Sequence, residues 1–159
     1  MPILMLVVSL LSLSVRVQPP LALDRLQGRW AGTGQVRGQA VRADLEFDRV
    51  LGGKFTRLRY AFRADAAGSP VLFEGHAYYS CPQGQPCGGQ WFDTLGMTRI
   101  ITAAQTSDTL ASEWKTAGSE AGKSEYRFGA DDALSVTDWV RGTDGTFREF
   151  GRVAYTRVK

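Results

Sequence analysis

The chain has 159 residues, of which 43% are hydrophobic and 22% charged, and this composition is ordinary for a single globular domain. Its 19 basic and 16 acidic residues give a formal net charge of +3, and no run of Lys or Arg occurs. Because this excess is small and evenly spread, we expect no nucleic-acid partner. The 18 glycines lie along the whole chain, which indicates many turns.

Residues 1–22 differ from the rest. The run "PILMLVVSLLSLSV" has the length of a signal-peptide core and is too short for a confident membrane span, and "QPPLA" then ends at the small residue Ala22. We expect a signal peptide over 1–22 that is cleaved near Ala22, one domain over 23–159, and an exported protein, periplasmic or secreted, with no stable membrane span after processing. No Lys or Arg precedes the apolar run, so an uncleaved anchor and a start further upstream are the alternatives.

The chain that follows reads as one short helical turn and then a series of strands. Asp24 to Gln27 can form the turn, with Asp24 as its cap. Ten strands are predicted, separated by Gly-, Asp- and Ser-rich turns. They are Gly28–Arg37, Val41–Val50, Lys54–Arg63, Val71–Ser80, Gln90–Leu95, Thr98–Ala104, Thr109–Thr116, Lys123–Gly129, Ala133–Arg141 and Thr146–Val158. The pattern predicts an all-β protein.

Several predicted strands carry the alternation of a half-buried strand. In "RLRYAFR" arginines alternate with large apolar residues, but "VLFEGHAYYS" places polar and aromatic residues on both faces. Such a strand suits a barrel whose interior is partly polar. About ten sequential, hairpin-joined strands therefore predict a single antiparallel up-and-down β-barrel, an architecture that can hold one small ligand.

The two cysteines, Cys81 and Cys87, flank the turn-forming sequence "PQGQP". After an export signal, such a pair is typical of a disulfide that pins a hairpin loop. A redox site would need C-x-x-C beside a βαβ unit, and a zinc site would need two more ligands, whereas His76 is the one histidine of the chain. We therefore predict a structural Cys81–Cys87 bridge and no metal site.

The segment "LQGRWAGTG" resembles the opening G-x-W of the calycin barrels, the lipocalins and fatty-acid-binding proteins. "LGGKFTRLRYAFR", "FEGHAYY", "WFDTLG" and "REFGRVAYTRV" are similar to an uncharacterised bacterial branch of these barrels. The resemblance implies that Trp30 closes one end of the barrel and packs against Arg157, in "YTRVK" of the last strand. Some of these barrels bind haem through a His close to the C-terminus, and this chain has none there, so we expect no cofactor.

The polar candidates for ligand contacts come from two strands. Glu74, His76 and Tyr78 share one face, and if that face points inward they form a carboxylate, an imidazole and a phenol in a cavity. Inward-pointing Arg57 and Arg59 would suit an anionic head group. The alternative for both sets is an ordinary solvated strand face.

The function that we expect is the binding of a small apolar or amphipathic molecule inside the barrel, with ligand contacts from His76, Tyr78, Arg57 and Arg59. One alternative is an isomerase or hydrolase on the same fold with His76 as acid or base. The other is a structural module with a filled barrel. The sequence contains neither G-x-S-x-G nor H-E-x-x-H, so no catalytic residue is assigned. The direction of the Glu74–His76–Tyr78 face distinguishes the three hypotheses.

Overall fold

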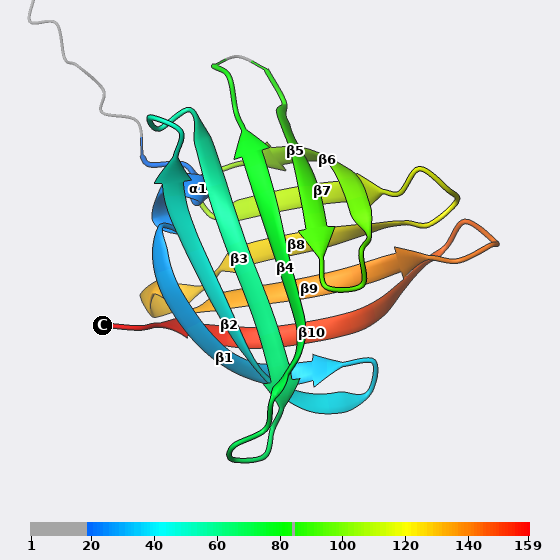
Figure 1. Cartoon of the computed structure of the whole chain (residues 1–159). Coiled ribbons are helices and arrows are strands. Elements are labelled where there is room, and N and C mark those ends of the chain that lie inside the picture. The colour runs from blue at the N-terminus through cyan, green and yellow to red at the C-terminus, as the bar shows by residue number, and fades with distance from the viewer. Residues whose placement is uncertain (1–18, 84) are drawn as a thin grey trace, which may run out of the picture.

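The computed structural model describes residues 19–83 and 85–159, and its ten antiparallel strands close into a barrel (Figure 1). The all-β prediction is confirmed, and each predicted strand matches an observed one to within a few residues. A short helix, α1 (Ala22–Arg25), precedes the barrel. The strands are β1 (Gly28–Val36), β2 (Gln39–Val50), β3 (Phe55–Ala64), β4 (Val71–Ser80), β5 (Cys87–Asp93), β6 (Thr98–Gln105), β7 (Thr109–Lys115), β8 (Ala121–Phe128), β9 (Leu134–Arg141) and β10 (Phe147–Arg157), with one turn of 3₁₀ helix at Ala130–Asp132 between β8 and β9.

Each strand pairs with the next one along the chain, and β1 pairs with β10 to complete the closure. The β1–β10 register places Trp30 beside Arg157 and Val36 beside Gly151. Because successive side chains alternate between the two faces of a strand, one set fills the interior and the other faces solvent. A shift of register between Glu149 and Gly151 marks a bulge in β10 against β9.

One end of the barrel is sealed by α1 and by two side chains from the closing strands. Leu23 and Leu26 of this segment are buried, and the Trp30 indole N–H donates to the Leu26 carbonyl at 2.8 Å. The Arg157 guanidinium lies 4.2 Å from the Trp30 ring centre and donates to the carbonyls of Gln27 and Arg25. Arg157 thereby satisfies carbonyls at the end of the helical turn while stacking on the indole.

The predicted cap of the helical turn is wrong. The turn begins at Ala22 rather than Asp24, its cap position is Leu21, and no side chain caps it. Asp24 instead pairs with Arg49 of β2. The helix is fixed by tertiary contacts, since the Ala22 N–H donates to the Thr106 carbonyl at 2.8 Å.

The leader predicted for residues 1–22 lies outside the described residues up to residue 18. Ala22, at the expected cleavage point, is fully buried at the sealed end. A cleavage that keeps Ala22 therefore preserves a packed residue and its hydrogen bond. Within the described part of the chain, no helix is long and apolar enough to cross a membrane.

The Cys81–Cys87 disulfide is confirmed, and it closes the β4–β5 loop at the same end as α1. Cys87 is buried, and the Gln105 side chain joins the bridge to the helix: its amide N–H lies 3.7 Å from Cys87 Sγ, and its carbonyl accepts from the Leu23 N–H at 3.0 Å. The bridge thus belongs to the sealed end, as do Trp30 and Arg157.

The double substitution Cys81→Ser and Cys87→Ser should lower the free energy of unfolding by about 2 kcal/mol, because a small loop is no longer closed in the unfolded chain. Urea unfolding followed by tryptophan fluorescence measures the loss. Binding of a probe in the barrel should not change, since the bridge lies at the end opposite the cavity opening described below. A loss of probe affinity in the double variant would contradict the independence of the cavity from the disulfide.

Candidate functional site

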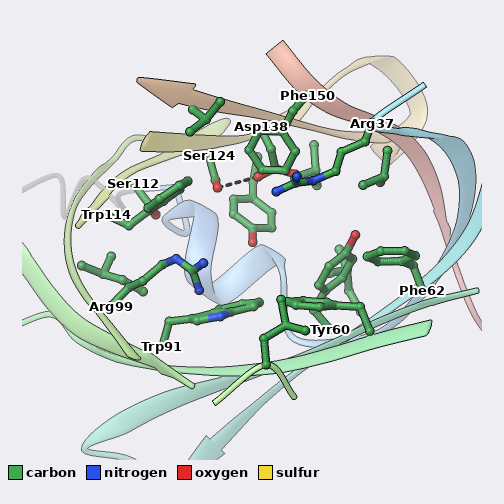
Figure 2. A pocket seen from close by; sticks show the side chains of 18 of the residues that line it. Arg37, Tyr60, Phe62, Trp91, Arg99, Ser112, Trp114, Ser124, Asp138 and Phe150 are labelled. Atoms are coloured by element: carbon green, nitrogen blue, oxygen red, sulfur yellow. Dashed lines mark hydrogen bonds between the residues drawn. The ribbon is translucent and has the colours of Figure 1, made fainter. Parts of the chain in front are cut away.

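The inward-facing side chains leave a cavity of about 400 Å³ in the barrel, away from the end that α1 seals. Its lining combines aromatic and aliphatic side chains with a few polar ones (Figure 2). The residues that line it are Val36, Arg37, Leu45, Tyr60, Phe62, Leu72, Phe73, Tyr79, Trp91, Leu95, Arg99, Ile101, Ser112, Trp114, Glu120, Ser124, Tyr126, Val136, Asp138, Val140, Phe150 and Tyr155. The exposed members Arg37, Leu72, Leu95 and Glu120 lie in or beside the turns opposite α1, so the cavity opens there.

Two glycines seat the tryptophans in the wall. A methyl group on Gly75 would overlap the Trp91 ring, and one on Gly122 would overlap the Trp114 ring. Each indole therefore lies against the bare backbone of a neighbouring strand. Phe73 stacks on Trp91, with ring centres 6.2 Å apart and planes 15° apart. This arrangement keeps large rings flat on the wall and leaves the centre of the cavity open.

A charged network supports the wall that carries Trp91. The side chain of Asp93 is fully buried and accepts from the Trp91 indole at 3.0 Å and from Arg99 at 2.5 Å. Its other oxygen accepts from the backbone N–H groups of Leu95 and Met97. Burial alone would raise the pKa of Asp93, but these hydrogen bonds together hold it below its ordinary value.

Arg99 connects this network to the cavity. Its guanidinium bonds Asp93 on one side and Glu120, at 3.1 Å, on the other, and it lies 5.1 Å from the Trp114 ring centre. Only 15% of its side chain is exposed. Two carboxylates thus offset the one charge of Arg99, which acts chiefly as a rigid part of the wall.

A row of polar side chains crosses the opposite wall. In the strand register Ser112 of β7 faces Ser124 of β8, Ser124 faces Asp138 of β9, and Asp138 faces Gly151 of β10. The Ser124 hydroxyl donates to the Asp138 carboxylate at 2.5 Å. Figure 2 shows this pair across the cavity from Trp91 and Tyr60.

Burial changes the acidity of the groups around this row. It raises the pKa of Asp138 to about 6, which the Ser124 hydrogen bond only partly opposes, and it raises the pKa of Tyr79 to about 12. Burial also raises the pKa of Tyr60, Tyr126 and Tyr155. At neutral pH the four phenols are therefore neutral, and Asp138 is the group of this wall that titrates near that range.

Arg57 and Arg59 lie on the outer face of the barrel, where cross-strand ion pairs hold them. Arg57 bonds both oxygens of Asp48, and Arg59 bonds Glu46, each from the paired position on β2. Their inward neighbours on β3 are Thr56 and Leu58, which are buried, and Tyr60, which lines the cavity. The predicted contact of these arginines with a ligand in the barrel therefore does not fit their position, because acidic residues on the same outer face already pair them.

Glu74, His76 and Tyr78 also point outward, since Gly75, Ala77 and Tyr79 are the buried residues of β4. His76 Nε2 lies 3.0 Å from Glu74 Oε1, so the predicted pairing forms, but outside the cavity. The enzyme hypothesis required this pair to face a cavity, and it does not. With His76 outside, no imidazole lines the cavity. The described residues contain no group of three His, Cys, Asp or Glu side chains that could hold a metal ion.

The inward polar row was missed in the sequence, although a signal for it exists. In "LSVTDWV" Leu134, Val136 and Val140 define the buried face, and Asp138 falls in phase with them. A carboxylate on the apolar face of a strand indicates a buried polar site. Ser124 also falls in phase with Tyr126 and Phe128, but a serine on a buried face is a weaker signal than a carboxylate, and Arg99 lies in a strand with apolar residues on both faces.

Comparisons with known proteins bear on the fold alone. No protein-family model matches the chain, and no curated protein matches it. Among solved structures the barrel is similar to the crystal structure of Rv2717c from M. tuberculosis, with a TM-score of 0.68 and 22% sequence identity. The match covers 87% of this chain and 96% of that one. The two proteins therefore share a barrel architecture over almost their whole lengths.

Gly75→Ala should force the Trp91 ring out of its seat and into the cavity. Overpacking of this kind costs about 1–3 kcal/mol, and it also strains the Trp91–Asp93 hydrogen bond. Gly88→Ala on β5 is the matched control, because a methyl group there meets nothing within 4 Å. Thermal unfolding and the Trp emission maximum should change in the first variant only. Equal melting temperatures and emission maxima in the two variants would contradict the contact between Gly75 and the Trp91 ring.

The raised pKa of Asp138 has a direct consequence for stability. Between its ordinary value of 3.8 and about 6, the folded protein binds a proton that the unfolded chain does not. The contribution of Asp138 to the free energy of unfolding therefore falls by about 3 kcal/mol as pH rises through this window. Asp138→Asn should remove this dependence.

Urea unfolding of the native protein and of Asp138→Asn at several pH values from 3.5 to 7 measures the effect. The stability of the variant relative to the native protein should increase as pH rises. Carboxylates with a lowered pKa, such as Asp93, are present in both proteins and cancel in the difference. A difference that does not change with pH would show that Asp138 is hydrated in the cavity.

Proposed function

We propose that this protein binds a small, partly apolar molecule inside its barrel and carries or sequesters it. The observation that supports the proposal is the open cavity of about 400 Å³. This volume falls within the range of small-molecule sites, and such sites combine apolar walls with a few fixed polar groups. Trp91, Trp114 and Tyr60 provide the first feature, and Ser112, Ser124 and Asp138 the second.

The alternative of a filled structural barrel is less consistent with this interior. That hypothesis expects bulky apolar side chains throughout the barrel, whereas buried polar groups line part of an open space. Keeping Asp138 in such a place costs stability, and a ligand contact would account for the cost.

The proposal includes the calycin type of barrel and the export of the protein. The calycin assignment is supported by the stacking of Arg157 on Trp30, the pair implied by the resemblance, at a barrel end sealed by a short helix. Export is supported by the disulfide, because such bonds persist in oxidising compartments. The expected leader, cleaved near Ala22 so that this buried residue stays with the barrel, completes this interpretation.

Titration with the neutral fluorescent probe N-phenyl-1-naphthylamine tests the proposal. The probe should brighten on binding and accept excitation energy from Trp91 and Trp114 in the wall. Val140→Trp, which places a large ring among the lining residues near the opening, should weaken binding at least tenfold by filling the space. Val71→Trp, at an exposed position of β4 outside the cavity lining, is the control.

Native mass spectrometry of the protein purified from its own source complements the titration, since a co-purified small mass released by mild denaturation would identify the natural ligand. The proposal fails if the probe does not bind, or if Val140→Trp and Val71→Trp bind it equally.

A further inference from the structure

The charges around the cavity are not balanced in the same way on its two walls. Arg99 is offset by Asp93 and Glu120. Asp138, in contrast, has one donor, the Ser124 hydroxyl, and within the described part of the chain no cationic nitrogen lies within 4.0 Å of it. A cavity with a neutralised arginine and an unpaired carboxylate favours a positive ligand over a negative one.

Ser112, which lies beyond Ser124 in the polar row, leaves bonding capacity near this carboxylate, and Gly151, its neighbour on β10, leaves room beside it. Ser112, in the same polar row, is only 4% exposed, and among the described residues its Oγ has no hydrogen bond of good geometry, although the Tyr79 hydroxyl lies close enough for Ser112 to lower the pKa of Tyr79. Gly151 faces Asp138 from β10, and a methyl group there would lie 3.4 Å from Asp138 Oδ2. A buried hydroxyl without a partner is costly, and a donor from a ligand would satisfy it.

We propose that the ligand of this cavity carries a protonated amine, which pairs with Asp138 and donates to Ser112, while its apolar body lies against Trp91, Trp114 and Tyr60. The inference rests on the proposed binding function and specifies its ligand class as amphipathic amines. An ammonium group provides up to three donors, and it suits a site with a carboxylate, a free hydroxyl and surrounding phenol rings.

The groups that face Asp138 are consistent with this assignment. Tyr60, Tyr79, Tyr126 and Tyr155 lie within electrostatic reach of the carboxylate, and all four stay neutral at physiological pH. Burial gives Asp138 a pKa of about 6, so it is mostly ionised at pH 7.5 and accepts a proton on mild acidification.

Arg37, the remaining cation of the lining, is exposed at the opening, and its guanidinium lies 5.7 Å from the Phe150 ring centre (Figure 2). It lies on the same side of the cavity as Asp138 and is the side chain that would compete with an amine for the carboxylate.

Three ligands that share a naphthalene body and differ in their polar group test the preference for an amine. They are 2-(2-naphthyl)ethylamine, 2-(2-naphthyl)ethanol and 2-naphthylacetate. Their affinities are measured by displacement of N-phenyl-1-naphthylamine at pH 7.5. The amine should bind at least about tenfold more tightly than the alcohol, and the carboxylate should bind most weakly, because a hydrogen-bonded charge pair exceeds a neutral contact by about this factor.

Asp138→Asn should bring the affinity for the amine down to that for the alcohol, and it should change the affinities for the alcohol and the probe much less than the affinity for the amine. Ser112→Ala should weaken amine binding several-fold, since it removes the second acceptor of the ammonium group. Glu120→Gln, at the other carboxylate of the lining, is the control and should keep the preference for the amine. In the native protein amine affinity should fall as pH is lowered from 7.5 to 5, and in Asp138→Asn it should not.

The inference is overturned if the carboxylate ligand binds most tightly, if amine and alcohol bind the native protein equally, or if the preference follows Glu120 or survives in Asp138→Asn. Each of these results still requires the probe to bind, so it leaves the proposed binding function intact. Absence of probe binding, in contrast, removes the proposed function itself.

Discussion

The pairing of the first strand with the last is the constraint on which this structure depends. It closes the barrel, and it brings Trp30 and Arg157 together beside the short helix. The Arg157 guanidinium stacks on the indole and bonds the carbonyl of Arg25 at the end of the helix and that of Gln27 just after it, so one side chain joins the helix, β1 and β10. A firm seal at this end permits an open interior, because the buried contacts that the cavity lacks are concentrated around α1 and the disulfide.

The interior combines features that oppose stability with features that suit the proposed ligand. Aromatic rings on the walls rest on glycine backbone. At the bulge in β10, Phe150 lines the cavity and Gly151 lies beside Asp138. Among the described residues, the polar row of Ser112, Ser124 and Asp138 contains a carboxyl that is bonded by Ser124 without a cation beside it, and a Ser112 hydroxyl without a hydrogen bond of good geometry. Natural proteins retain such costs chiefly where they serve recognition, which is why this row, rather than the outer histidine, is central to the proposal.

Most of the fold could be predicted from the sequence, because alternation and turn residues act locally. The ten strands followed from these signals, and the loop disulfide followed from two cysteines around a turn. The capping role of Asp24 failed because a tertiary ion pair with Arg49 uses that carboxylate. Local signals can assign a strand, but they cannot decide at which residue a helical turn begins when tertiary contacts fix it.

The candidate site was harder to predict, because it depends on which face of each strand turns inward. The alternation of "ADLEFD" with "RLRYAFR" pairs acidic and basic residues across β2 and β3, and that complementarity indicates an outer face for Arg57 and Arg59. For β4 no such partner pattern exists, so the sequence does not show whether His76 points into the barrel or out of it. Asp138 was detectable in phase with Leu134 and Val136, but its row with Ser124 and Ser112 arises from strand register, which single-strand patterns do not contain.

Closure by the terminal strands also has a consequence for how the protein matures. The contacts between Trp30 and Arg157 join positions more than 120 residues apart, so they are among the last that a growing or translocating chain can form. Until β10 is available, β1 has an open edge, and the cavity lacks the wall that contains Phe150 and Tyr155. Partly made or C-terminally clipped chains would therefore have neither a complete pocket nor a protected edge, and the proposed ligand binding would be a property of finished molecules only.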